Sequence, residues 1–304
     1  MNSSPAPWTK RQIIITAAAI TLLIALAWFY LRPHARQVTH GFVAYYIVSH
    51  ILAFSPGDLA AAYDPTWFAA AVARTVTPAV QEVFTVQPPT MSLLLLPLVW
   101  LPHDAARAVW LGVSLLFMIA GLMLLADALA LPRRWGLWAA PLLFAFLPVR
   151  EVFRMGQAYL ILFFLLCLVF WSLLRQPRGR NADLVGGLAL GLMAVLKTAA
   201  LWLWPLLLIG RQWRVVAWAA LTAGLVVLVS LLRIGLAPWQ VYLDQLPRLA
   251  SMPERSVTAY QTVTSLLLQL FAYDVRFNPA PAVQWPALAA ALTLAVQLTT
   301  FGLT

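Results

Sequence analysis

The segment LVGGLALGLMAVLKTAALWLWPLLLIG runs from Leu184 to Gly210 and carries one charged residue, Lys197, at its midpoint. As one straight helix it would extend about 40 Å, whereas the hydrocarbon core of a bilayer is about 30 Å thick. Lys197 would then lie near the bilayer centre, at a cost of roughly 2.5–3.5 kcal/mol. A straight helix would also place the basic turns RQPRGR and RQWR on opposite faces, against the positive-inside pattern. We therefore expect a hairpin of two half-length helices with Lys197 at its tip.

The composition of the whole chain indicates a multi-pass integral membrane protein. Of its 304 residues, 62% are apolar and only 10% are charged, and the mean hydropathy is +0.84. Several apolar runs reach the length that spans a bilayer, and they are continuous rather than alternating, so the predicted fold is all-α. The net charge of +10 would indicate nucleic-acid binding in a soluble protein. Here the basic residues lie in short turns, so the charge reports topology, with the N-terminus in the cytoplasm and no nucleic-acid partner.

The chain is predicted to form one transmembrane domain over residues 1–304, with a first external loop at 32–88 and a second external segment at 235–281. The stretches GFVAYYIVSHILAF and DPTWFAAAVARTV in the first loop, and WQVYLDQLPRLASM in the second, are expected to be short helices at the membrane interface. The segment PPTMSLLLLPLVWLP is short for a span, so it is re-entrant or interfacial unless another short segment fails to span. The last apolar run, from Ala287, is expected to be followed by further spans in a longer natural protein.

Polar residues that could carry chemistry gather on the predicted external side. Lysine and arginine side chains there suit a phosphate at the membrane surface, and a carboxylate could accept a proton from an attacking hydroxyl. Simpler roles compete with these, such as a helix cap for Asp64, a turn for Asp58 and interfacial anchoring for Lys197. The set consists of Asp58, Asp64, Glu82, Gln87, Arg150, Glu151, Arg154, Gln157, Lys197 and Gln261.

Metal and disulfide chemistry are not expected. The single cysteine, Cys167, lies in an apolar run and cannot form an internal disulfide. The four histidines show no metal-ligand spacing, and no clustered cysteine or aspartate supports a metal site.

Several pieces of the chain, taken in order over residues 13–285, resemble the polyprenyl-phosphate-sugar-dependent glycosyltransferases of family 87. These belong to the GT-C class and include mannosyltransferases of actinobacterial envelopes. The pieces are FVAYY, YDP, QPPTMSLLLLPLVWLP, GQAYLILFFLL, the lysine-containing stretch GLALGLMAVLKTAALWLWPLLL followed by RQWR, GLAPWQVYLDQLP and YQTVTSLL.

The resemblance implies a GT-C helical bundle in the bacterial cytoplasmic membrane, with its active site on the extracytoplasmic face. The donor would be a sugar, with mannose favoured, on a polyprenyl phosphate. The acceptor would be a lipid or glycan of the cell envelope. Transfer would invert the anomeric centre without a metal or other cofactor, and no protein partner is predicted.

The site residues follow from matching positions, with one departure. The family places an aspartate before the phenylalanine that precedes its tyrosines, and here that position is Gly41. The base cannot be carried over, so Asp64 is our first candidate, Asp58 the second and His40 the third. Lys197, with Arg154 or Arg150, is expected to hold the lipid phosphate. The remaining predicted substrate-binding residues are Gln157, Gln261, Tyr45 and Tyr46.

Two other functions stay open. A transporter or flippase for a lipid-linked intermediate would also use broken helices and a cation at mid-membrane depth. Against it, the polar residues gather on one side, and no inverted repeat is evident. A non-catalytic family member that binds a polyprenyl lipid is the other alternative, because the aspartate before Phe42 is missing.

Overall fold

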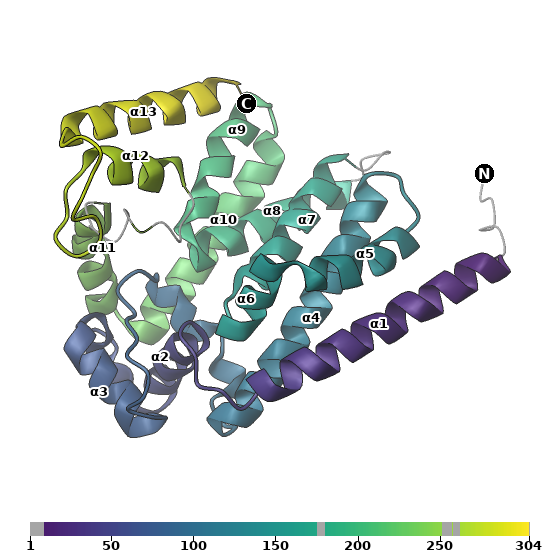
Figure 1. The fold of residues 1–304 in the computed structure, drawn as a ribbon, viewed down its shortest axis with the longest axis horizontal. Helices are drawn as coiled ribbons and strands as arrows, with labels where there is room; N and C mark the ends of the chain where they lie inside the picture. Colours follow the sequence, from purple (N-terminus) through teal and green to yellow (C-terminus); the bar gives the residue numbers. More distant parts are fainter. Residues whose placement is uncertain (1–8, 175–179, 251–256, 258–261, 304) are drawn as a thin grey trace. The chain divides into compact units, whose positions relative to one another are not determined.

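A computed structural model describes residues 9–174, 180–250, 257 and 262–303 of the chain (Figure 1). The predicted all-α fold is confirmed: within these residues the only β structure is an isolated bridge between Asp274 and Asn278. By its contacts the chain divides into two compact units, Met1–Tyr242 and Leu243–Thr304. Whether residues 1–304 act as one transmembrane domain stays a prediction.

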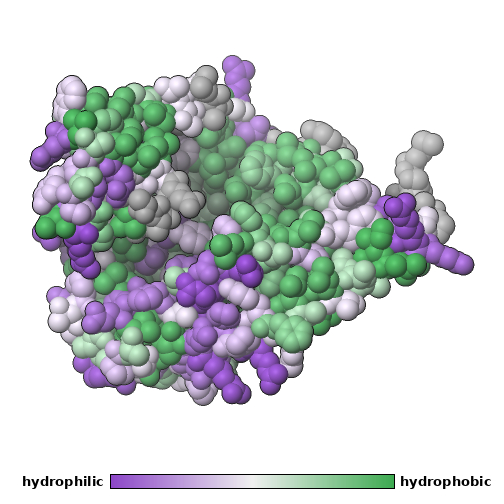
Figure 2. Space-filling view, viewed as in Figure 1, coloured by the Kyte–Doolittle hydropathy of each residue, from purple (hydrophilic) through white to green (hydrophobic). Residues whose placement is uncertain are grey.

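Three helices of the first unit are long and apolar enough to cross a membrane, namely α1 (Lys10–His34), α4 (His103–Ala128) and α10 (Trp213–Ile234). A fourth span is available if α5 (Arg134–Ala145) and α6 (Leu147–Met155), which meet at an angle of 78°, count as one bent span. Large apolar side chains on these helices are exposed, and Figure 2 shows broad hydrophobic areas on the visible face. Such a surface is stable where lipid replaces water, so the prediction of a multi-pass membrane protein is confirmed.

The predicted break at Lys197 is present. The helix α8 (Arg180–Leu196) ends one residue before it, and a 3₁₀ helix, η5 (Thr198–Trp202), leads into the short helix α9 (Leu203–Ile209). The preceding helix, α7 (Tyr159–Leu174), has 16 residues. At 1.5 Å per residue its described part extends about 24 Å, somewhat less than the roughly 30 Å hydrocarbon core.

The helices α8 and α10 run parallel and in close contact. A Cβ atom on Gly187 would lie 2.8 Å from the carbonyl oxygen of Val215, and one on Gly191 would lie 2.6 Å from that of Ala219. The contacts therefore advance in the same direction along both helices. Small residues allow such close backbone approach between membrane helices. Because the two helices are parallel, residues 198–212 must bring the chain back, which is the hairpin geometry expected from the charge pattern.

The segment predicted as the first external loop contains two helices, α2 (Phe42–Phe54) and α3 (Pro65–Thr75), separated by the 3₁₀ turns η1 (Pro56–Asp58) and η2 (Ala61–Tyr63). The helix α2 is buried on nearly every side and so does not expose a face to the membrane, whereas its position at the interface stays a prediction. A helix that is apolar all round is stable only inside a protein or a membrane. In contrast, α3 buries one face through Phe68, Ala71 and Val72, as an amphipathic helix should.

Residues 88–102 do not form a spanning helix. They form two 3₁₀ helices, η3 (Pro89–Leu93) and η4 (Leu96–Leu98). The former packs against α2, α8 and α10, and four of its five residues, from Pro89 to Ser92, are buried. Irregular backbone of this kind is tolerated at membrane depth where surrounding protein covers it.

The segment predicted as the second external one begins with α11 (Ala237–Ala250), whose Tyr242 belongs to the core of the first unit. The second unit contains α12 (Val263–Phe271) and α13 (Pro286–Leu303), which pack against each other. The buried side-chain amide of Asn278 donates hydrogen bonds of 2.7–3.2 Å to the carbonyl oxygens of Leu268, Gln269 and Ala272. These bonds tie the segment around Asn278 to the carbonyl groups at the end of α12, where a helix lacks some of its regular partners.

A buried arginine fixes the junction of α1, α2, α4 and α6. Arg107 of α4 is fully buried. Its guanidinium donates to the carbonyl oxygen of His34 at 2.7 Å, to the hydroxyl of Thr39 at 2.7 Å and to the carbonyl oxygen of Arg154 at 2.6 Å. A buried charge is tolerated when its donors are satisfied in this way. Arg107 thus joins the end of α1, the segment before α2 and the end of α6.

Replacing Arg107 with leucine should destabilise the fold, because the buried hydroxyl of Thr39 and the half-buried carbonyl groups of His34 and Arg154 lose a donor. Loss of the donor to a buried acceptor costs about 1–3 kcal/mol, and the His34 carbonyl keeps a bond from the N–H of Gln37. We expect a clear fall in the melting temperature of the detergent-solubilised protein, measured by differential scanning fluorimetry. The exposed Arg74 on α3 is the matched control, and Arg74→Leu should leave the melting temperature close to that of the wild type. Equal melting temperatures for the two variants would contradict the organising role of Arg107.

Candidate functional site

Lys197 directly follows the last residue of α8. Its own backbone is extended, with φ −147° and ψ 109°. The last carbonyl groups of a helix lack intrahelical partners. One of them, that of Val195, accepts a hydrogen bond from the hydroxyl of Thr90 in η3. This bond fastens the buried segment Pro89–Leu93 to the end of α8, beside the lysine.

The Lys197 ammonium lies 5.2 Å from the ring centroid of Tyr159, the first residue of α7. A cation at this distance from an aromatic face is attracted to it, by about 0.5–2 kcal/mol depending on exposure. Lys197 and Tyr159 also line a small cavity of about 10 Å³, together with Tyr45 of α2 and Met91 of η3. The half-buried lysine is therefore held among aromatic and apolar neighbours.

Tyr45 and Gln157 are joined directly. The Tyr45 hydroxyl donates a 2.8 Å hydrogen bond to Oε1 of Gln157, which lies between α6 and α7. Burial raises the pKa of the Tyr45 phenol, so the phenol remains a neutral donor. The structure thus brings three predicted substrate-binding residues, Lys197, Gln157 and Tyr45, around one point.

Gly41 occupies a position where a side chain does not fit. Its φ is 88°, and a Cβ atom would lie 2.7 Å from Nε2 of Gln157 and 3.0 Å from the carbonyl oxygen of Met155. L-residues rarely adopt positive φ, whereas glycine does so readily. The structure therefore accounts for the glycine in physical terms, since the Gln157 side chain fills the space that an aspartate at this position would need.

A carboxylate nevertheless reaches this point from another part of the chain. The backbone N–H of Gly41 donates a 2.6 Å hydrogen bond to Oε2 of Glu82. The Glu82 side chain is 14% exposed, and Nδ1 of His40 lies 3.5 Å from the same oxygen. Because Gly41 also adjoins Gln157, the Glu82 carboxylate lies next to the group that contains Tyr45 and Gln157.

The two aspartates predicted as bases have other surroundings. Asp64 is the exposed N-cap of α3, and its carboxylate accepts a 2.8 Å hydrogen bond from the backbone N–H of Trp67. This is the simpler role that the YDPTW motif allowed. Asp58 is exposed and ends the turn η1. The contacts described for these two carboxylates do not include Lys197, Gln157 or Tyr45.

The two arginines predicted to hold the phosphate together with Lys197 contact other residues. Arg154 pairs with Glu151 one helical turn earlier, with 2.6 Å between Nη2 and Oε2. The Arg150 guanidinium lies 5.7 Å from the ring centroid of Tyr30 on α1.

Two further predicted residues bear less directly on this group. Tyr46 donates a 2.9 Å hydrogen bond to the carbonyl oxygen of Leu101, and its ring packs against Phe42 and His103. Gln261 lies outside the described residues.

Three residues of the candidate site, Glu82, Thr90 and Tyr159, were not among the catalytic or substrate-binding residues predicted from the sequence. Glu82 was one of many polar residues there, and no local pattern connects it with Gly41. Thr90 and Tyr159 lie inside the quoted motifs QPPTM and GQAYL, which were the available signal. Among the described residues, no three His, Cys, Asp or Glu side chains come together as a metal site. The expectation of metal-free chemistry stays a prediction.

Comparison with known protein families gives one result. The model of glycosyltransferase family 87 matches residues 84–303, more than two thirds of the chain. The match includes Gln157, Tyr159 and Lys197, whereas Tyr45, Gly41 and Glu82 precede it. No curated protein and no solved structure matches the chain.

The geometry of Gly41 predicts that any side chain there disturbs the site. Gly41→Ala should lower the melting temperature, because the new Cβ meets Gln157 and the backbone must keep a positive φ. Gly41→Asp should have a larger effect. Gly57→Ala is the matched control, because a Cβ atom on Gly57 has no neighbour within 4 Å. Fluorimetry of the purified variants tests this, and a Gly41→Asp protein as stable as the Gly57→Ala protein would contradict it.

Proposed function

The chain belongs to glycosyltransferase family 87, and on that premise we propose that it transfers a sugar from a polyprenyl-phosphate donor to a lipid or glycan of the cell envelope. Mannose is the favoured sugar. The reaction takes place on the extracytoplasmic face of a bacterial cytoplasmic membrane, with the N-terminus in the cytoplasm. One observation carries the proposal: a lysine at a helix break lines a cavity with the buried Tyr45, Tyr45 is bonded to Gln157, and a carboxylate adjoins that pair.

In the proposed reaction, an acceptor hydroxyl attacks the anomeric carbon of the donor. The bond from that carbon to the phosphate oxygen breaks, and polyprenyl phosphate leaves with the bonding electrons. A single displacement of this kind inverts the anomeric centre. The proton of the attacking hydroxyl passes to a carboxylate, a step that typically contributes about 10²–10⁴-fold to the rate.

Lys197 is the proposed partner of the lipid phosphate, because a fixed cation stabilises the charge that develops on the leaving group. Its contact with the Tyr159 ring holds the ammonium at the break between α8 and η5. Arg154 and Arg150 remain candidates for this role only if they exchange their present neighbours, Glu151 and Tyr30, for the phosphate. Gln157 is proposed to orient the sugar, with Tyr45 fixing its side-chain amide.

Glu82 is the carboxylate that we assign as the base, ahead of Asp64 and Asp58. Its two oxygens accept hydrogen bonds from the backbone N–H groups of Gly41 and Val83, at 2.6 Å and 3.0 Å. These bonds orient the carboxylate beside Gln157. His40, the third candidate, lies against Glu82 and is 58% exposed, so it can adjust the environment of the carboxylate.

Lys197→Ala should lower transfer by about 10²-fold or more, as expected for loss of a group that stabilises developing charge. Purified protein is incubated with radiolabelled polyprenyl-phosphate mannose and a membrane lipid extract, and label in the acceptor fraction is counted. Lys197→Arg keeps the charge and should retain part of the activity. Wild-type turnover by Lys197→Ala would exclude the phosphate role.

Glu82→Gln should reduce transfer by about 10²–10⁴-fold, because the amide keeps an oxygen for Gly41 but cannot accept the proton. The same assay measures this, and an unchanged melting temperature separates loss of the base from loss of the fold. Asp64→Asn is the control, since asparagine caps a helix as well as aspartate does. Loss of activity in Asp64→Asn with full activity in Glu82→Gln would return the role to Asp64. If the wild-type protein moved labelled lipid across vesicles without transferring sugar, the flippase alternative would replace the proposal.

A further inference from the structure

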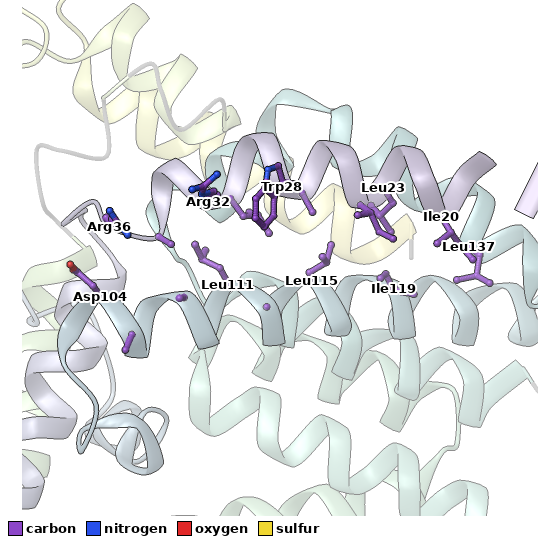
Figure 3. Close-up of a pocket in the computed structure, with 17 residues that line it drawn as sticks. Ile20, Leu23, Trp28, Arg32, Arg36, Asp104, Leu111, Leu115, Ile119 and Leu137 are labelled. Carbon is purple, nitrogen blue, oxygen red and sulfur yellow. The ribbon is translucent and has the colours of Figure 1, made fainter. Parts of the chain in front are cut away.

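A groove of about 770 Å³ lies between α1 and α4, away from the residues assigned to sugar transfer. It arises because α1 packs mainly against α5 and touches α4 little. Figure 3 shows Leu23 of α1 pointing toward Leu115 and Ile119 of α4, with Ile20 beside Leu137 of α5. The volume is within the range of small-molecule sites, about 300–1,000 Å³.

The floor of the groove is made of small residues on α4. Ala105, Ala108 and Gly112 line it at spacings that place them on one helix face. A Cβ atom on Gly112 would have no neighbour within 4 Å, so the space above this glycine is open. The α1 wall consists of apolar side chains from Ile20 to Leu31. This stretch of helix rises about 16 Å, close to half of the roughly 30 Å hydrocarbon core. The apolar part of the groove therefore matches the depth of one leaflet.

Two arginines mark one end of the groove. Figure 3 shows Arg32 and Arg36 there, with Asp104 nearby. Arg32 and Arg36 also line an adjoining hollow of about 220 Å³. The Arg32 guanidinium lies 4.8 Å from the ring centroid of Trp28, another lining residue, which holds it over the groove.

These guanidinium groups are available to a ligand. Both arginines are exposed, and neither forms an ion pair with a carboxylate in the part of the chain that the structure describes. Asp104 is instead bonded to its neighbour His103 at 3.1 Å. Guanidinium groups are well suited to phosphate oxygens, which they can bind through two parallel hydrogen bonds. Tryptophan and arginine at the end of an apolar helix also place this end at the level of the lipid headgroups.

We propose that the α1–α4 groove binds one acyl chain of an anionic glycerophospholipid, with Arg32 and Arg36 holding its phosphate. The leaflet-length apolar wall and the cationic end together match the two parts of such a lipid. The second acyl chain lies outside the groove, along the exposed face of α1. This site is independent of the proposed glycosyl transfer, and its test does not use activity.

Native mass spectrometry of the purified protein titrated with phosphatidylglycerol measures the binding. We expect one lipid to bind more tightly than the rest. Arg32→Ala/Arg36→Ala should weaken this binding at least ten-fold, and the equally basic pair Arg211→Ala/Arg214→Ala, at the start of α10, should not. Diacylglycerol, which lacks the phosphate, should bind the wild type at least ten-fold more weakly than phosphatidylglycerol.

A second variant tests the apolar part without removing charge. Gly112→Phe should fill the groove and release the lipid while the protein keeps its melting temperature. Gly224→Phe is the matched control, because Gly224 lies within the long apolar helix α10 and its Cβ position is equally open. Equal lipid binding by wild type, Arg32→Ala/Arg36→Ala and Gly112→Phe would overturn the proposal. Preferential displacement of phosphatidylglycerol by polyprenyl phosphate would also overturn it, since the groove would then serve a longer isoprenoid chain.

Discussion

The buried guanidinium of Arg107 is the interaction on which the arrangement of the first unit depends. It takes three acceptors from segments far apart in the sequence, at His34, Thr39 and Arg154. One turn further along α4, the Trp110 indole donates a 2.9 Å hydrogen bond to the carbonyl oxygen of Gly156. Together these bonds fix the residues just before Gly41 and just before Gln157. The candidate site is therefore positioned from α4, a helix that contributes no residue to it.

The candidate site itself is assembled from short pieces of irregular backbone, each held by a more regular element. Lys197 follows the last residue of α8, Gln157 lies between α6 and α7, and Gly41 precedes α2. Backbone groups at such places lack regular partners, so they are free to bind side chains. The bonds from Gly41 N–H to Glu82 and from Thr90 to the Val195 carbonyl are examples. The side chains that satisfy these backbone groups are thus also residues of the candidate site.

The sequence predicted those features that a local pattern determines. Apolar runs identified the long helices, and the charges of neighbouring turns identified the break at Lys197, because both follow from the cost of placing polar groups in lipid. The burial of α2 was not predicted, since aromatic residues interrupted by histidine and serine suit an interface as well as a core. The role of Arg107 and the position of Glu82 were missed for another reason. Both depend on contacts between residues separated by tens of positions, and no periodicity records such contacts.

The parallel course of α8 and α10 has a consequence for membrane topology. Consecutive spans normally alternate in direction, and these two helices avoid the rule only because residues 198–212 fold back between them. If α8 and α10 both lie across the bilayer, the reversal in that segment determines on which side the residues after α10 emerge. A single continuous helix in place of α8, η5 and α9 would point α10 in the opposite direction relative to α8. The residues after α10 would then emerge on the other face of the membrane.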